Sequence, residues 1–249
     1  MSPAHDVRVA DDGRARCGWV GDDAEYRRYH DEEWGVALHG DRALFEKLSL
    51  EAFQSGLSWI TILRRREGFR RAFAGFDPAA VAAFDESDVA RLLADESIIR
   101  NRAKIEATIA NAQLLVTHIA LEPGGLDELV WRHAPAPRAT RLAQLADLPA
   151  STPESVALAR TLKAVGWRFV GPTTAYALMQ SAGLVDDHIV GCWRATATTG
   201  GSDVSQSCGT TRSSSPGAPG RRIHPRSAER ATTPSSVVGI GPDSSRVRR

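Results

Sequence analysis

Two pairs of cysteine and histidine residues carry the side chains best suited to bind a metal ion. Cys17 and His30 enclose twelve residues, and His188 and Cys192 enclose three. Thiolate and imidazole are the ligands that zinc prefers, and four of them close a tetrahedral site with no position left for water. The gap between the pairs is too long for a zinc finger, so ordinary cysteines and histidines are the alternative. If all four converge, one structural zinc ion ties the beginning of a domain to its end.

Glu51 is an acidic residue within an apolar helical pattern. Leu44, Leu48 and Glu51 recur at the spacing of one helix face, in a helix predicted to run from Asp41 to about Gln54. A carboxylate on such a face is costly unless it is paired, and such positions are often functional. The alternative is that Glu51 lies at the edge of this face and accepts a hydrogen bond from a backbone amide.

Aromatic residues surround Glu51 in the sequence. Tyr29 and Trp34 precede it, and Trp59 follows it by eight residues, in a chain with six tryptophans. Most tryptophans in a helical protein fill the core. Aromatic faces with one acceptor also form a slot for a flat, electron-poor ring, and a cationic ring gains further from the π faces.

Residues 153–183 are predicted to form two helices joined by a short connection at 166–171. The amides of Gly171, Thr173 and Thr174 then lie at a helix N-terminus, where a phosphate is favoured, and Lys163 and Arg168 add positive charge. Gly171 is expected to let the backbone turn tightly and approach a ligand. A plain pair of antiparallel helices is the alternative.

The remaining pattern predicts helices throughout residues 41–194. A long helix is indicated by apolar residues at one-face spacing, Ile105, Ile109, Ala112, Val116 and Ile119. Asp77-Pro78 and Thr152-Pro153 are typical of helix starts. Because no run of strict alternation is found, the predicted fold class is all-α.

Composition limits the possible locations and partners. The chain has 249 residues, 42% of them hydrophobic, which is enough for a core. It has no apolar run long enough to span a membrane, and its first 16 residues lack the apolar segment of a secretory signal. Three cysteines cannot form a full disulfide set. We therefore expect a cytoplasmic protein with no membrane partner. A monomeric state is a separate expectation.

The two ends of the chain differ from its centre. Residues 1–14 are expected to be a disordered extension, and residues 195–249 a disordered tail rich in Ser, Thr, Gly, Pro and Arg that contains a free thiol at Cys208. The tail carries eight arginines and three acidic residues, a net +5, which leaves −4 on residues 1–194. Any binding of nucleic acid by the domain at 15–194 must therefore come from a local basic patch.

Four motifs in this order resemble the bacterial 3-methyladenine DNA glycosylase I family; they lie at 16–20, 29–36, 56–61 and 187–192. The resemblance covers about residues 15–194. It implies a helix-hairpin-helix DNA glycosylase fold with one bound zinc ion. Members of this family usually end shortly after the last zinc cysteine, whereas this chain continues for 57 residues beyond it.

The resemblance also implies roles for individual residues. It makes Glu51 the carboxylate that recognises the base and contributes to catalysis, and it makes residues 166–171 the DNA-backbone anchor. Gly56 and Leu57 become the loop that fills the gap left by an extruded nucleotide. The implied zinc ligands are Cys17, His30, His188 and Cys192, and the implied aromatic pocket consists of Tyr29, Trp34 and Trp59.

The expected activity is hydrolysis of the N-glycosidic bond of 3-methyladenine in double-stranded DNA. A zinc-stapled DNA-binding module without catalysis is the alternative, and a zinc hydrolase is disfavoured because four protein ligands leave no open position. Asp186 receives no catalytic role. Asp187 is expected to orient a zinc-binding histidine by accepting its hydrogen bond.

Overall fold

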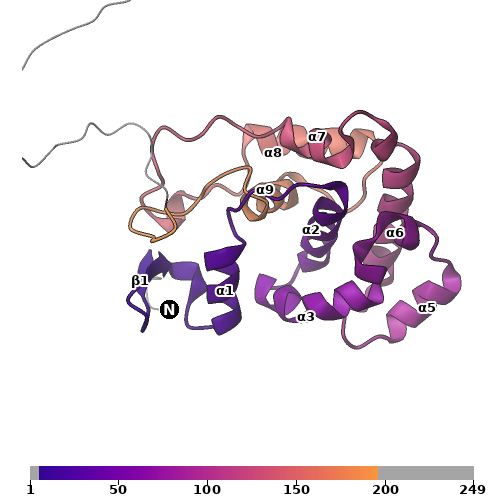
Figure 1. Cartoon of the computed structure of the whole chain (residues 1–249), viewed down its shortest axis with the longest axis horizontal. Coiled ribbons are helices and arrows are strands. Elements are labelled where there is room, and N and C mark those ends of the chain that lie inside the picture. The colour runs from indigo at the N-terminus through magenta and orange to yellow at the C-terminus, as the bar shows by residue number, and fades with distance from the viewer. Residues whose placement is uncertain (1–5, 196–249) are drawn as a thin grey trace, which may run out of the picture. The chain divides into compact units, whose positions relative to one another are not determined.

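The computed structural model describes residues 6–195, and these form the predicted, mostly helical fold (Figure 1). They lie within one compact unit. Of the tail predicted at 195–249, residues 196–249, which include Cys208, fall outside the described residues. The elements are β1 (Val7–Val9), β2 (Ala15–Cys17), α1 (Ala24–Glu32), α2 (Asp41–Gln54), α3 (Trp59–Ala72), α4 (Pro78–Ala82), α5 (Glu86–Ala94), α6 (Arg102–Thr117), α7 (Gly125–Trp131), α8 (Pro153–Ala164) and α9 (Pro172–Ser181), with short 3-10 helices η1 (Gly18–Val20), η2 (Ala74–Phe76), η3 (Ile119–Leu121) and η4 (Leu145–Asp147).

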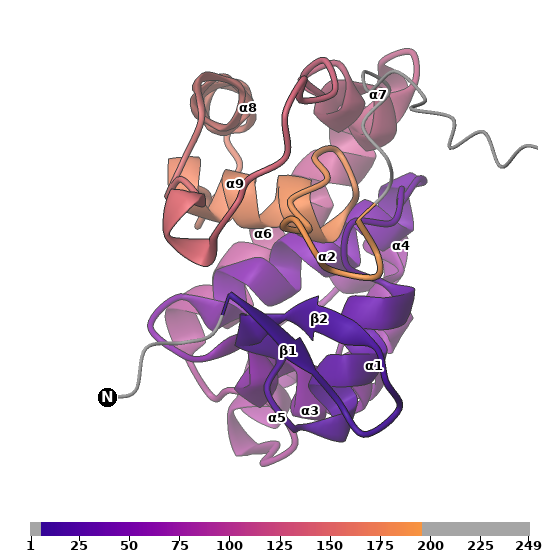
Figure 2. The same cartoon turned by 90° about the vertical axis from the view of Figure 1, so that its left-hand side faces the viewer.

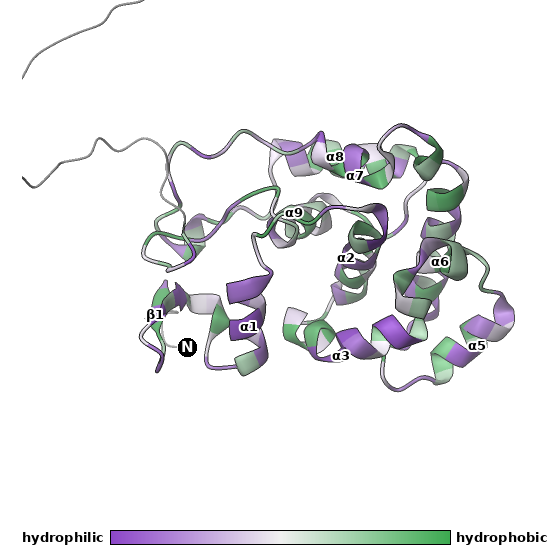
Figure 3. Ribbon diagram, in the orientation of Figure 1, coloured by the Kyte–Doolittle hydropathy of each residue, from purple (hydrophilic) through white to green (hydrophobic). Residues whose placement is uncertain are grey.

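Helix α2 is the central helix of this unit, because it packs against α3, α6, α7 and α9. The main core gathers around it and includes a group of phenylalanines with no exposed surface, Phe45, Phe53, Phe69, Phe73 and Phe76. Figure 3 shows hydrophobic and hydrophilic residues mixed within α3 and α5, as expected for helices with only one face in the core, whereas α2 buries nearly all of its residues from Leu44 to Phe53. The helix that carries Glu51 is therefore held on several sides.

The predicted helix starts are confirmed. Asp77 accepts a hydrogen bond from the amide of Ala80 at 3.0 Å, and Thr152 accepts one from the amide of Ser155 at 3.2 Å. In both helices a proline follows the capping residue, where its missing N–H costs nothing. The Thr152 cap fixes the start of α8, the first helix of the predicted pair.

The prediction of disorder over residues 1–14 is wrong for residues 6–14, and residues 1–5 lie outside the described residues. β1 and β2 form an antiparallel hairpin, with Val7 opposite Cys17 and Val9 opposite Ala15 (Figure 2). Gly13 supplies the left-handed conformation of the turn, with φ +75°. The hairpin is held by distant contacts that local sequence does not reveal, such as the hydrogen bond from the amide of Trp193 to the carbonyl of Ala15 at 2.8 Å.

Candidate active site and metal centre

The two cysteine–histidine pairs come together in the structure. Their four ligand atoms lie within 4.8 Å of one another, and all four residues are buried. The Sγ atom of Cys192 lies 3.4 Å from Nε2 of His30 and 3.6 Å from Nδ1 of His188, and Sγ of Cys17 lies 3.9 Å from the same Nδ1. These three separations are close to the spacing between neighbouring ligands of a tetrahedral ion bound at about 2.0–2.3 Å.

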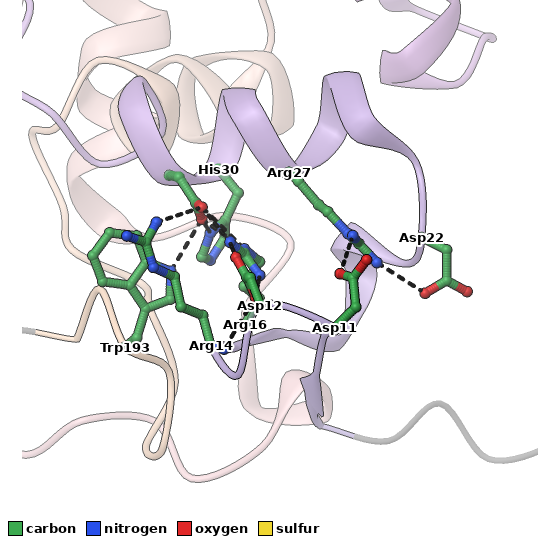
Figure 4. Close-up of polar contacts among 9 residues, drawn as sticks. Asp11, Asp12, Arg14, Arg16, Asp22, Arg27, His30 and Trp193 are labelled. Carbon is green, nitrogen blue, oxygen red and sulfur yellow. Dashed lines mark hydrogen bonds and ion pairs between the residues drawn. The ribbon is translucent and has the colours of Figure 1, made fainter.

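Each histidine of this cluster has a partner on its other ring nitrogen. Nδ1 of His30 is 2.8 Å from a carboxylate oxygen of Asp31, and Nε2 of His188 is 3.3 Å from the carbonyl of Trp34. Asp31 also accepts from Arg16 and from the indole of Trp193, the network drawn in Figure 4. These acceptors direct the opposite nitrogen of each ring towards the cluster.

Asp187 does not orient either histidine, so that expectation is wrong. Its buried carboxylate accepts from the hydroxyl of Tyr176, from Nε2 of Gln180 at 2.9 Å, and from Nε of Arg138 at 3.2 Å. The neighbouring Asp186 is paired with Arg141 at 2.6 Å. Asp31, which directly follows His30 in the sequence, takes the part that was expected of Asp187.

A cavity of about 310 Å³ lies beside the cluster, and Glu51 forms part of its wall. Tyr29, Trp34 and Trp59 line it as well, so the structure brings the four predicted pocket residues together. Trp34 also packs edge-on against His188, with ring centroids 4.7 Å apart. One aromatic side chain is thus shared by the cavity and the cysteine–histidine cluster.

Two aromatic residues of this cavity were not assigned from the sequence. Trp19 and Tyr26 line it, and the ring of Trp19 lies 5.6 Å from that of Tyr26 and 5.2 Å from that of Trp34. A signal was present, because Trp19 follows Cys17 by only two residues. Anchoring Cys17 in the cluster therefore carries Trp19 to the cavity.

Glu51 projects from α2 into the core side of the cavity, and only 4% of it is exposed. Burial raises the pKa of its carboxyl to about 7, while Lys47 and the hydroxyl of Ser181 act in the opposite direction. Ser181 donates to Oε1 of Glu51 at 3.1 Å. The pKa of this carboxyl therefore lies near neutral pH, and the carboxyl is accessible from the cavity.

Lys47 lies one helical turn before Glu51 and is also buried. Its ammonium is 5.3 Å from the ring centroid of Tyr29 and 5.7 Å from that of Trp59. Burial lowers the pKa of Lys47, and the charge of Glu51 opposes that change. A fixed cation thus stands behind two aromatic walls of the cavity.

The loop after α2 presents an apolar side chain to solvent. Leu57 is 41% exposed, and Gly56 before it adopts φ +84°, a conformation that favours glycine. Lys104 of α6 fixes the start of this loop by donating to the carbonyls of Phe53 at 2.9 Å and Ser55 at 2.7 Å. Leu57 therefore stands on an anchored loop close to the cavity wall formed by Trp59.

Helices α8 and α9 are joined by residues 165–171. Lys163 and Arg168 are exposed and have no ion-pair partner among residues 6–195. No side chain within that range caps the N-terminus of α9, so the amides of Thr173 and Thr174 have no such partner there. The connection therefore carries exposed positive charge and helix amides without a side-chain cap, and phosphate binding there stays a prediction.

The expectation that Gly171 makes a tight turn is wrong. Its φ of −134° is an extended conformation that other residues adopt readily. The left-handed positions of this connection are Gly166, with φ +99°, and the exposed Phe169, with φ +54°. A side chain at position 171 would meet no atom within 4 Å, so the space in front of α9 is open to a ligand.

A model of the family described as methyladenine glycosylase matches residues 19–195. This range includes the cavity, the α8–α9 connection, and every residue of the cysteine–histidine cluster except Cys17. The chain belongs to the methyladenine glycosylase family. Within the residues that the structure describes, this family member has no helix long and apolar enough to cross a membrane.

Three relatives illustrate the similarity. DNA-3-methyladenine glycosylase 1 of Escherichia coli is 47% identical over 180 residues, which cover 71% of this chain and 95% of that protein. A crystal structure of 3-methyladenine DNA glycosylase I matches with a TM-score of 0.69 at 47% identity and covers 72% of this chain and 98% of the other. The Staphylococcus aureus enzyme, whose structure concerns recognition of 3-methyladenine, has a TM-score of 0.65 at 32% identity, with 69% and 91% covered.

Proposed function

We propose that this glycosylase family member hydrolyses the N-glycosidic bond of 3-methyladenine in double-stranded DNA and leaves an abasic site. The observation that carries this proposal is the buried Glu51 in the wall of an aromatic cavity. The curated relatives have the matching name, DNA-3-methyladenine glycosylase. A DNA-binding module without catalysis has no use for a carboxylate in such a cavity.

The chemistry of the substrate explains why so few groups are needed. A methyl group on N3 gives the base a positive charge, so the base leaves readily without being protonated by the enzyme. The protein then has to expose the base and hold it. Extruding a damaged, poorly stacked nucleotide costs only a few kcal/mol. Within the cavity, Tyr29, Trp34 and Trp59 stack on the cationic ring, and Glu51 accepts hydrogen bonds from its edge.

DNA is held by two parts of the chain in this proposal. Leu57, carried by Gly56, enters the stack at the position vacated by the extruded nucleotide. On the other side, the amides of Gly171, Thr173 and Thr174 bind a backbone phosphate, with Lys163 and Arg168 adding charge, so that residues 153–183 act as a helix-hairpin-helix. The opposed contacts bend the duplex around the flipped nucleotide.

The metal in this proposal is a single zinc ion with a structural role. Two buried cysteines and two histidines with oriented rings match the donor set that zinc prefers. When bound, the ion supplies folding energy and leaves no position for a reacting water, so Cys17, His30, His188 and Cys192 hold the two ends of the domain together. We further propose that the protein acts as a monomer in the cytoplasm.

Incubation of the full chain with methylated duplex DNA, followed by identification of the bases set free, tests the function. We expect release of 3-methyladenine and expect Glu51→Gln to lower the rate about 10- to 100-fold, the value of a hydrogen bond to a charged group. The matched control is Glu122→Gln, which changes an exposed glutamate and should leave the rate unaltered.

Two results would contradict the proposal in different ways. Binding of methylated DNA without release of any base would favour the non-catalytic module. A normal rate of base release by Glu51→Gln would leave the proposed activity standing but would show that Glu51 has no part in it. Metal content should be the same in both variants, because neither residue belongs to the cysteine–histidine cluster.

A further inference from the structure

Gln180 occupies a position on the cavity wall that the proposed mechanism does not use. It lies in the last turn of α9, three residues after Ala177, and both residues line the cavity together with Glu51. Its Nε2 is 2.9 Å from Oδ2 of Asp187. Among residues 6–195, no hydrogen bond reaches its carbonyl oxygen Oε1.

The orientation of the Gln180 amide follows from the chemistry of its neighbour. A carboxylate only accepts hydrogen bonds, so the amide atom that faces Asp187 must be the NH₂ group. The carbonyl oxygen then lies on the other branch of the amide, away from Asp187. This assignment leaves Gln180 with an unused acceptor in a side chain that borders the cavity.

Asp187 is itself held firmly. Its side chain is fully buried, and it receives Tyr176 and Gln180 on Oδ2 and the guanidinium of Arg138 on Oδ1 at 3.1 Å. Burial raises the pKa of the Tyr176 hydroxyl, and the hydrogen bond to Asp187 adds to this effect, so the hydroxyl remains a donor. Three donors on one buried carboxylate leave it no freedom to rotate, and the amide of Gln180 is fixed with it.

We propose that Oε1 of Gln180 is a second hydrogen-bond acceptor for the extruded base, and that Gln180 and Glu51 form an acceptor pair that selects the amino group of a 3-alkyladenine over the oxo group of a 3-alkylguanine. This inference rests on the proposed function. Asp187 is a positioning residue, because it holds the amide of Gln180 by a hydrogen bond and does not itself line the cavity.

The amino group of adenine has two hydrogens, which suit two acceptors. Glu51 offers its Oε2 to one of these hydrogens, because its Oε1 accepts from Ser181, and Gln180 offers an acceptor to the other. Guanine has an oxygen at the same ring position, and an oxygen that faces two acceptors is repelled and leaves both of them unpaired. Unpaired buried polar groups are an effective basis for discrimination between similar substrates.

The test is the ratio of the single-turnover rates at which 3-methyladenine and 3-methylguanine are released from methylated duplex DNA. Gln180→Met keeps the length of the side chain and removes the acceptor. We expect release of 3-methyladenine to fall about tenfold, the effect of one neutral hydrogen bond, with little change for 3-methylguanine. Gln113→Met, an exposed position on α6, is the control and should preserve the ratio.

An equal fall for both bases, or an unchanged ratio at an unchanged melting temperature, would overturn the proposal. Failure of the wild-type chain to release any base would instead overturn the proposed function. These outcomes are distinct, because the first concerns a ratio and the second concerns the presence of activity.

A second variant tests the orientation itself. In Asp187→Asn, Arg138 retains the remaining oxygen at the Oδ1 position, so the new amide group faces Gln180 and reverses its amide. An N–H donor then points into the cavity, and we expect the ratio to shift further towards 3-methylguanine at unchanged metal content. A wild-type ratio in a folded Asp187→Asn protein would contradict the inference, and if that variant does not fold, Gln180→Met decides.

Discussion

Glu51 is surrounded by groups that set its charge. Burial favours the neutral carboxyl, and the ammonium of Lys47 and the hydroxyl of Ser181 favour the ionised one, which leaves the pKa at about 7. Only the ionised form attracts a cationic base and offers all of its lone pairs. Glu51 is protonated below its pKa, so base release should rise with pH through neutrality and reach its plateau above it.

Lys47 should determine where this rise occurs. Lys47→Met removes a cation that lowers the pKa of Glu51, so we expect the rise in excision rate to move to higher pH, with the plateau less affected. Lys47→Arg, which keeps the charge, should restore the wild-type profile. Single-turnover rates measured from pH 5 to 9 provide the test. A pH profile of Lys47→Met that superimposes on the wild type would exclude this role.

At the residue scale, the sequence identifies candidate ligand and acceptor side chains better than it identifies the groups that contact them. Cys17, His30 and Glu51 could be selected because their side chains have few structural uses at those positions. The sequence did not reveal Asp31 as the partner of His30, or Lys47 behind the aromatic walls. Charged residues are common, and only tertiary packing decides which of them meets a buried group.

Among the helices, α6 contacts both the loop that carries Leu57 and the connection between α8 and α9. Lys104 holds the end of α2 ahead of the Leu57 loop. Seven residues later on the same face, the buried Asn111 accepts from the amide of Arg168 at 2.8 Å and donates to its carbonyl at 3.2 Å. One rigid helix therefore sets the distance between the two segments proposed to contact DNA.

Asn111→Leu should loosen the connection between α8 and α9 while leaving the cavity unchanged. We expect affinity for methylated and unmethylated duplexes to fall by the same factor, about fivefold for the loss of these hydrogen bonds. Affinity for free 3-methyladenine should be unaltered. Gln113→Leu on an exposed face of α6 serves as the control in the same fluorescence-anisotropy titration. A loss confined to methylated DNA would place the defect in the cavity instead.

The elements themselves were predicted with mixed success. The helices α2, α8 and α9 follow from apolar periodicity and from capping residues such as Thr152, because both signals are local. The β1–β2 hairpin was missed although Asp12-Gly13 is a turn signal, since three-residue strands leave too little alternation to detect. The conformation of Gly171 could not be predicted, because open space in front of a backbone is a tertiary property.

At the scale of the whole molecule, the cysteine–histidine cluster joins segments far apart in the chain, since Cys17 and His188 are separated by 171 positions in residue number. Figures 1 and 2 show the first and last described segments side by side at this point. Closing a loop of this length costs the folding chain entropy, and an ion bound only in the folded state offsets that cost. Trp34 packs against both histidines and also lines the cavity, so the cysteine–histidine cluster and the proposed base-binding cavity share one aromatic wall.

Removal of the proposed zinc ion by a strong chelator should therefore lower the melting temperature and the rate of base release together. We expect a fall in Tm on the order of 10 °C, which corresponds to roughly 4 kcal/mol of binding free energy in a domain of this size. Refilling the apoprotein with cadmium, which thiolates also bind, should restore both properties, because the ion performs no chemistry on the substrate. Calorimetry and base release measured on the same samples provide the comparison. A cadmium form that melts like the native protein but releases no base would assign the metal a part in the reaction, and an apoprotein of unchanged Tm would contradict the structural role.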